Sequence, residues 1–137
     1  MREILFRGKT QSGEWVEGVA IFADDKSFIL NNAKVEFVKG YNENHLNFVL
    51  QEFLPETVGQ YTGLTDKNGK KIFEGDICQT KGFPLIDEKP FVIEWNSDEC
   101  SFYWRDAEGT DEFTIGCSQC TTVIGNIHDN PELLKGE

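Results

Sequence analysis

The sequence has no long apolar run and no recognisable export signal. No stretch approaches the roughly 18–20 apolar residues that a transmembrane helix needs. The first residues, Met1 to Ile4, enter a strand-like segment without the apolar region and cleavage site of a secretory signal. Hydrophobic residues nevertheless make up 39% of the 137 residues and aromatic residues 12%, which excludes a disordered chain. We expect a single soluble domain in the cytoplasm, since ordinary domains contain about 100–150 residues.

Basic residues are also scarce. The 13 Lys and Arg are outnumbered by 24 Asp and Glu, which gives a formal net charge of −11. Residues 1–54 carry six basic and eight acidic groups, whereas residues 55–137 carry seven and sixteen, and 87–112 holds nine acids against Lys89 and Arg105. Such a field repels a phosphate backbone, whose binding depends largely on Lys and Arg. We interpret the acidic segment as a solvated surface, with an acidic face for a basic partner, or a mimic of nucleic acid, as the alternatives.

Cysteine is infrequent, and its spacing favours no metal site. The four are Cys78, Cys100, Cys117 and Cys120, and only the last two form a Cys-X-X-Cys pair. Without a secretion signal, a disulfide framework is not expected. A structural zinc site needs a second ligand pair, and a thioredoxin-like pair needs a helix N-terminus after a strand. We therefore expect ordinary, partly buried thiols, with no metal and no other cofactor.

What the sequence does contain is a series of short strand-like segments. They alternate apolar and polar residues, are rich in aromatic and β-branched side chains, and are separated by Gly, Asn and Asp. The predicted strands are 4–7, 14–22, 27–30, 35–38, 58–64, 71–73, 77–80, 91–95, 101–106, 112–115 and 121–127. Short strands at regular spacing are typical of a β-sandwich or barrel. We expect a mainly β fold of antiparallel sheets, with a small SH3-like β-barrel in the C-terminal half.

One segment fits two periodicities. Between residues 44 and 54, apolar residues recur at the spacing of an amphipathic helix, yet Phe48, Leu50, Glu52 and Leu54 also nearly alternate. Pro55 ends the segment under either interpretation. A strand is favoured because the flanking segments are strands.

Two turns are marked by the sequence. Asn68-Gly69, between strand-like runs, favours a two-residue type I′ hairpin turn, in which both central residues have positive φ. At the C-terminus, Asn130 and Pro131 occupy the N-cap and N1 positions of a short helical turn.

Three blocks of the sequence stand out: MREILFRGK at the N-terminus, VGQYTGLTDKNGKKIFEGDI over 58–77, and VIGNIHDNPELL over 123–134. Together they resemble the YopX family of small proteins encoded by bacteriophages and prophages. The resemblance implies a mainly β protein with an SH3-like barrel, made in a bacterial host cell. It implies one YopX-like domain over 1–137, which subdivides into an N-terminal β region (1–54) and the barrel (55–137). The family has no settled activity, so no functional residue is carried over.

Catalysis is not expected from these residues. Glu74, Asp76 and His128 are the acids and base nearest the YopX-like blocks, but turn-stabilising roles explain the carboxylates more simply. Asp66 has the same interpretation, since it precedes a turn. The glycines of the central block form no phosphate loop, because no Gly-Lys-Ser/Thr follows a strand. We therefore assign no catalytic, cofactor-binding or metal-binding residue.

The leading hypothesis is a non-enzymatic protein-interaction module. Exposed members of the aromatic run around Tyr103 are better suited to protein contact than to base stacking, because their flanks are acidic. The candidate interaction surface comprises Tyr103, Glu94, Asp106 and Glu108. The alternatives are an enzyme using Glu74, Asp76 and His128, or a nucleic-acid-binding module. The latter would require a converging stripe of Arg2, Arg7, Lys9, Lys34 and Lys39.

Self-association is expected as well. A 54-residue half does not readily bury all of its aromatic side chains, and small sheets leave edges that another copy can cover. The aromatic residues in question are Phe6, Trp15, Phe22, Phe28 and Phe37. The partners expected are thus an unidentified phage or host protein and a second copy, with no membrane and no duplex DNA.

Overall fold

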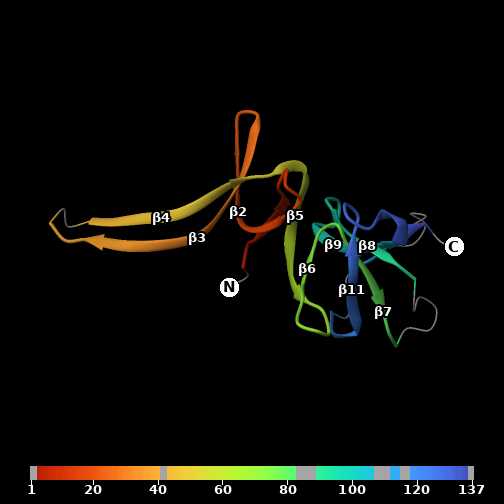
Figure 1. The fold of residues 1–137 in the computed structure, drawn as a ribbon. Coiled ribbons are helices and arrows are strands. Elements are labelled where there is room, and N and C mark those ends of the chain that lie inside the picture. The colour runs from red at the N-terminus through yellow and green to blue at the C-terminus, as the bar shows by residue number, and fades with distance from the viewer. Residues whose placement is uncertain (1–2, 41–42, 83–88, 107–111, 115–117, 136–137) are drawn as a thin grey trace. The chain divides into compact units, whose positions relative to one another are not determined.

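The computed structural model describes residues 3–40, 43–82, 89–106, 112–114 and 118–135, and these form β-strands with two 3-10 turns (Figure 1). The chain divides into an N-terminal unit, Ile4–Gln60, and a C-terminal unit from Tyr61 onward. Among the described residues, no helix is long and apolar enough to cross a membrane. The elements are β1 (Phe6–Lys9), β2 (Trp15–Ala23), β3 (Lys26–Val38), β4 (Glu43–Glu52), β5 (Leu54–Thr65), β6 (Lys71–Phe73), β7 (Asp76–Thr80), β8 (Phe91–Asn96), β9 (Ser101–Asp106), β10 (Glu112–Thr114), η1 (Ser118–Cys120), β11 (Thr121–Asn126) and η2 (Pro131–Leu134).

The N-terminal unit is built on antiparallel strands in the order β4-β3-β2-β1-β5. Its core contains Val16, Ile29 and Phe53, against which Phe6, Ala20 and Val58 pack. A Cβ on Gly8 would overlap the Phe53 ring, so glycine lets this ring lie on strand β1. Successive side chains of β2 thus point alternately into a small core on one side of the sheet and away from it on the other.

β3 and β4 continue beyond this core as a long two-stranded ribbon. In Figure 1 the ribbon runs away from β1 and β5 of the same unit. β2 pairs with β3 only over Lys26–Leu30, whereas β3 and β4 remain paired from Phe28↔Glu52 out to Val38↔Glu43. Within the described part of the chain, the outer part of the ribbon therefore consists of two strands, over Asn31–Val38 and Glu43–Val49.

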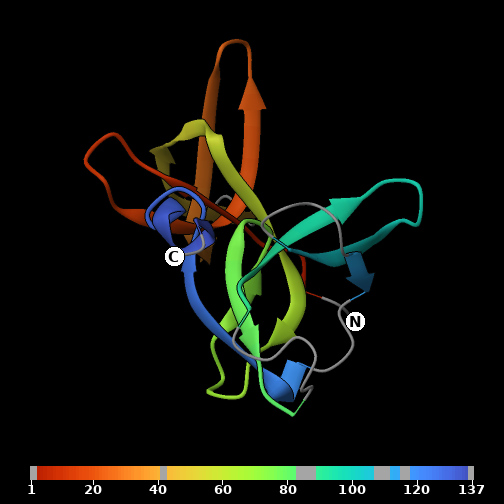
Figure 2. The same cartoon turned by 90° about the vertical axis from the view of Figure 1, so that its right-hand side faces the viewer.

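The C-terminal unit contains a second antiparallel sheet, in the order β10-β9-β8-β7-β11. Figure 2 shows β8 and β9 as a hairpin, drawn in teal. Residues of alternating position from β7, β8 and β9 form the core with Ile72 of β6 and Val123 of β11, namely Cys78, Phe91, Ile93, Phe102 and Trp104. β6 itself pairs with the second half of β5 through Tyr61↔Phe73 and Thr65↔Lys71.

The prediction of a mainly β fold with antiparallel sheets and a C-terminal turn is confirmed. The ambiguous segment 44–54 is a strand over most of its length, as favoured, because it pairs with β3. The strands predicted separately at 27–30 and 35–38 are one continuous strand, β3. A closed barrel is not present in the described residues: β10 and β11 lie at opposite ends of the C-terminal sheet and no pairing joins them there.

The hairpin between β5 and β6 exists, but the type I′ turn is wrong. Gly69 has φ +81°, whereas Asn68 is not among the residues with positive φ. The Gly69 N–H donates to the Asp66 carbonyl (3.0 Å), and the Asp66 N–H donates to the Lys70 carbonyl (2.8 Å). The loop therefore has three residues with glycine last, in the left-handed region, which is the other common way to close a hairpin.

The C-terminal turn η2 begins with Pro131 at its first turn, as predicted. Asn130 does not cap it through its side chain. The Asn130 Oδ1 instead accepts the backbone N–H of Asn126 (3.2 Å), and a Cβ on Gly125 would lie only 2.6 Å from this oxygen. Asn130 thus holds the turn against the end of β11.

Candidate interaction sites

Asp76, one of the three residues of the enzyme hypothesis, stabilises a turn. Its side chain is 1% exposed, and its Oδ2 accepts the backbone N–H of Phe73 (2.7 Å). The Gly75 carbonyl accepts the N–H of Ile127 (2.9 Å), which brings the backbone of this turn next to the residue preceding His128. The backbone near Glu74 and Asp76 thus lies close to that near His128. The Asp76 carboxylate, however, binds the backbone of its own turn.

Asp66 plays the corresponding part in the β5–β6 hairpin. Its Oδ1 accepts the N–H groups of Asn68 (2.8 Å) and Lys70 (2.9 Å), and its Oδ2 accepts that of Val123 on β11 (3.0 Å). Burial by itself would raise the pKa of this carboxyl, but the hydrogen bonds from Val123, Lys70 and Asn68, with the Lys70 charge, lower the pKa below its ordinary value. Asp66 is thus a structural carboxylate at the turn, as its position predicted, and it also ties the hairpin to β11, which the sequence did not indicate.

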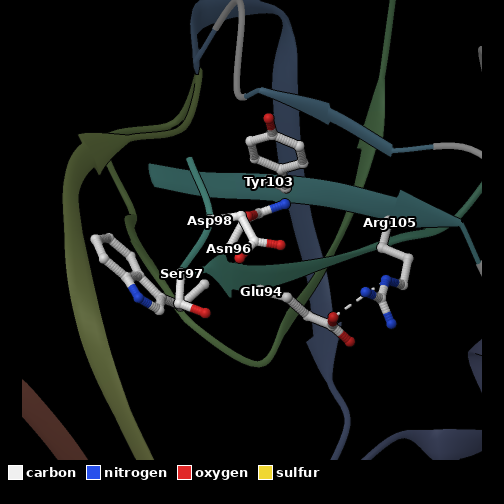
Figure 3. A pocket seen from close by; sticks show the side chains of 7 residues that line it. Glu94, Asn96, Ser97, Asp98, Tyr103 and Arg105 are labelled. Carbon is white, nitrogen blue, oxygen red and sulfur yellow. Dashed lines mark ion pairs between the residues drawn. The ribbon is translucent and has the colours of Figure 1, made fainter. Parts of the chain in front are cut away.

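Tyr103 and Glu94 of the predicted interaction surface come together on one face of the β8–β9 hairpin. They are directly opposite each other in the ladder. Both line a depression of about 280 Å³, together with Trp95, Asn96, Ser97, Asp98 and Arg105. Figure 3 shows the side chains of this depression, Glu94 and Tyr103 among them. The Asn96 Oδ1 accepts the Glu99 N–H (3.0 Å), which orders the connecting turn.

The depression is nearly balanced in charge rather than strongly acidic. Arg105 Nε lies 3.2 Å from Glu94 Oε2, and the two side chains are 44% and 41% exposed (Figure 3). An exposed ion pair of this kind contributes about 0–1 kcal/mol. Because Arg105 neutralises Glu94, this face offers polar contacts rather than a strong electrostatic site.

The other two residues of the predicted surface do not join this face. Asp106 is opposite Phe91, one step out of phase with Glu94 and Tyr103, so it lies on the other face of the hairpin. Glu108 lies outside the described residues.

The described cysteines differ from the expectation of ordinary, partly buried thiols both in exposure and in bonding. Cys78 is free and buried, and Cys100 is free and exposed. Cys120 is disulfide-bonded, so the expectation of a free thiol is wrong there, and Cys117 lies outside the described residues. Among the residues that are described, no three His, Cys, Asp or Glu side chains are grouped to hold a metal ion.

The basic residues of the nucleic-acid hypothesis are partly engaged elsewhere. Arg7 is only 9% exposed, and its guanidinium lies 4.8 Å from the centre of the Trp15 ring. Lys9 approaches the same ring at 5.9 Å, and Arg2 lies outside the described residues. Arg7 therefore serves the packing of the N-terminal unit.

The most prominent candidate surface, which the sequence did not identify, is one face of the β3–β4 ribbon. Directly paired residues share a face, so the pairs Leu30↔Leu50 and Val35↔Leu46 define it. We call it the apolar ribbon face and define it by five side chains that are exposed by 69%, 57%, 54%, 47% and 46%, respectively: Val35, Phe37, Leu46, Phe48 and Leu50.

A β-bulge keeps this face continuous. Between the pairs Asn31↔Val49 and Lys34↔Asn47, β3 has two residues, Asn32 and Ala33, where β4 has only Phe48. Asn32 takes a positive φ of 53° at this point. The extra residue shifts the alternation of β3, so that Val35 and Phe37 fall on the same side as Leu30. Without it they would point to the opposite face.

The opposite face of the ribbon is mostly polar and hydrogen-bonded, although it includes Val49 and Val38. Asn47 donates to Glu36 Oε2 (3.3 Å), and Asn31 donates to Gln51 Oε1 (3.4 Å). His45 Nε2 lies 3.1 Å from Glu43 Oε1. We call this side the polar ribbon face. Antiparallel sheets that bury one side and expose the other to water show the same difference between an apolar and a polar face.

The comparisons with known proteins agree with the sequence blocks. The chain matches the family described as YopX protein over residues 5–135. Among solved structures it is similar to protein EF1440 from Enterococcus faecalis, known from a crystal structure, with 27% identity and a TM-score of 0.66 over 98% of this chain and 99% of that one. No curated protein matches the sequence. Because the family match spans nearly all of the residues, the chain belongs to the YopX family.

Proposed function

We propose that this protein is a phage- or prophage-encoded accessory protein that acts in the cytoplasm of the bacterial host as a non-enzymatic protein-interaction module. The observation that carries the proposal is the apolar ribbon face, whose five side chains are each exposed by 46% or more. The phage origin rests on the family resemblance of the three sequence blocks.

The exposure of this face favours a role in binding. The largest apolar patch on a typical monomer is about 300–600 Å² and is often functional. Here the apolar side chains are consecutive on one side of a ribbon and are adjoined by Val19 and Ile21 of β2, which share the face through the pairs Val19↔Leu30 and Ile21↔Phe28. Scattered exposed apolar residues need no explanation, but a row of this kind does.

The charge distribution supports a protein as the partner rather than nucleic acid. A phosphate backbone is repelled by a net charge of −11. The five residues of the apolar ribbon face also include no Lys or Arg that could bind it. Apolar and aromatic side chains are instead what the centre of a protein interface contains.

Affinity capture from prophage-induced host cells tests the proposal. The wild type is compared with Phe48→Glu, on the apolar ribbon face, and with Val49→Glu, the adjacent residue on the polar ribbon face. Phe48 and Val49 are 47% and 44% exposed, so both changes replace a similarly exposed apolar side chain with the same charge. We expect a bound protein with the wild type and Val49→Glu, and its loss with Phe48→Glu. Equal capture by all three variants, or none by the wild type, would contradict the proposal.

A further inference from the structure

We propose that the protein which covers the apolar ribbon face is a second copy of this chain, with the two ribbons packed face to face about a two-fold axis. This inference rests on the proposed function and names its partner. A two-fold pair brings the same residues of both copies together, which suits a surface that is apolar throughout.

The ribbon needs a cover for its own stability. Beyond Leu30 no third strand pairs with it among the described residues, since β2 pairs with β3 only as far as Val19↔Leu30. An isolated two-stranded hairpin is at best marginally stable in water, and its stability rises when a further layer buries its apolar side. Here the apolar side carries Phe37, Phe48 and Leu46, all exposed in the single chain.

The area available is sufficient for a stable dimer. With Val19 and Ile21 added, the exposed fractions correspond to on the order of 600 Å² per chain, since a fully exposed aromatic side chain alone offers about 150–250 Å². Two copies packed face to face would therefore bury up to about 1,200 Å², above the roughly 1,000 Å² that marks a specific interface.

The charge of the ribbon permits two copies to meet there. The chain as a whole carries −11, so its copies repel each other. Residues 26–52 have no net charge, with three Lys and three Glu: Lys26, Lys34, Lys39, Glu36, Glu43 and Glu52. The charged residues paired in the outer ladder, Lys34, Glu36 and Glu43, all belong to the polar ribbon face. Between the pairs Leu30↔Leu50 and Phe37↔Asn44, none of the directly paired residues on the apolar side is charged.

The position of the bulge supports the same conclusion. A ribbon exposed to water on both sides has no need to keep its apolar residues in phase. The bulge at Asn32 and Ala33 does so, at the expense of a positive φ in a non-glycine residue. This arrangement is understandable if the whole face, from Leu30 to Phe37, is buried in the assembled protein.

Sedimentation of the purified protein tests the inference. At micromolar concentration we expect the wild type and Val49→Glu to be dimers. Phe48→Glu should raise the dissociation constant of the dimer on the order of 30-fold or more, because it places a charge at the centre of the interface in both copies. Leu46→Glu, on the same face, should have the same effect. Circular dichroism of each variant verifies that the sheets are retained.

Three results would overturn the inference. One is a wild type that remains monomeric at high micromolar concentration. Another is a dimer that Phe48→Glu and Leu46→Glu leave intact, which would place the interface elsewhere. The third is equal weakening by Val49→Glu, which would indicate pairing along the edge of β4 rather than across its face. In the capture experiment, a wild-type monomer that still retains a different protein in a Phe48-dependent manner would leave the proposed function intact and refute only self-association.

Discussion

At the scale of single residues, Asp66 stabilises both the β5–β6 hairpin and its contact with β11. Its two carboxylate oxygens accept three backbone N–H groups, two within the hairpin and one from Val123 on β11. The same contacts explain the turn that sequence analysis misassigned. Because the carboxylate takes up the N–H groups of Asn68 and Lys70, Asn68 keeps a negative φ and Gly69 alone enters the left-handed region.

Replacing Asp66 with Asn should destabilise the C-terminal unit. The amide keeps one acceptor oxygen but presents an NH₂ group to a backbone donor, so that one buried N–H loses its partner. We expect the free energy of unfolding to fall by about 1–3 kcal/mol at neutral pH. Chemical denaturation measures this, with Asp25→Asn, an exposed carboxylate in the β2–β3 turn, as the control that should change little.

The same carboxylate predicts an acid dependence. Its pKa in the folded protein is lowered, so its contribution is complete above the ordinary unfolded value of about 3.9 and is lost as the pH falls through the lower folded value. We therefore expect the stability difference between the wild type and Asp66→Asn to be constant at neutral pH and to narrow below about pH 4. A difference that grows with acidity would contradict this assignment.

We expect glycine to be required at position 69 because of its backbone conformation, and not because a larger side chain would clash. A Cβ at this position would meet nothing within 4 Å, so φ +81° is the sole constraint. Gly69→Val should lower the free energy of unfolding by about 1–3 kcal/mol, and Gly69→Asn by less, since Asn tolerates this region. If Gly69→Val kept its melting temperature while losing a partner, the loop would be a recognition element.

At the scale of elements, alternation located most of the strands. The predicted segments 14–22, 71–73, 91–95 and 101–106 agree with β2, β6, β8 and β9 to within one residue at each end. Local patterns could not show that 27–30 and 35–38 form one strand, because Asn31-Asn32 resembles a turn. The strand continues past these residues because β3 pairs with β4 on both sides of them.

The same limit explains why the apolar ribbon face was not predicted. Phe28 and Leu30 are even-numbered, whereas Val35 and Phe37 are odd-numbered, so simple alternation assigns them to opposite faces. The bulge that unites them depends on the pairing partner. Phe22 and Phe37 are 61% and 57% exposed, which agrees with the expectation that the N-terminal half does not bury all of its aromatic side chains. Only the register shows that Phe37 belongs to the apolar ribbon face, whereas Phe22, paired with Ser27, lies on the other side of the sheet.

If the bulge sets the phase of β3, then deleting or inserting one residue there should affect self-association differently. Deleting Asn32 should convert the bulge to a regular ladder and leave Val35 and Phe37 on the apolar ribbon face, so self-association should persist. Inserting one Ala after Ala33 should turn Val35 and Phe37 to the polar ribbon face, because one more residue shifts the alternation of β3 again. We expect the insertion to raise the dissociation constant of the dimer at least about 10-fold. Sedimentation compares the two, and equal behaviour would show that the phase of β3 does not matter.

At the scale of the whole molecule, the charge is unevenly distributed along the sequence. Residues 55–137 hold seven basic and sixteen acidic groups, whereas the ribbon segment 26–52 is neutral. Composition predicted an acidic protein with little affinity for phosphate, and it could indicate self-association from the number of aromatic residues. It could not locate the surface, because burial and exposure of Phe, Leu and Val depend on strand register rather than on their number.

The last prediction is that the protein does not bind duplex DNA appreciably at physiological salt. Non-specific binding has a dissociation constant of about 10⁻⁴–10⁻⁶ M even for proteins with favourable charge, and a net charge of −11 opposes it. Of the basic residues that could form a stripe, Arg7 is buried over Trp15, while Lys34 lies on a ribbon whose three Lys are matched by three Glu. A fluorescence anisotropy titration at about 150 mM salt should give no saturation in the micromolar range. Submicromolar affinity that falls steeply with added salt would mean that phosphate contacts carry the binding, and a nucleic-acid role would then replace the protein-interaction role proposed here.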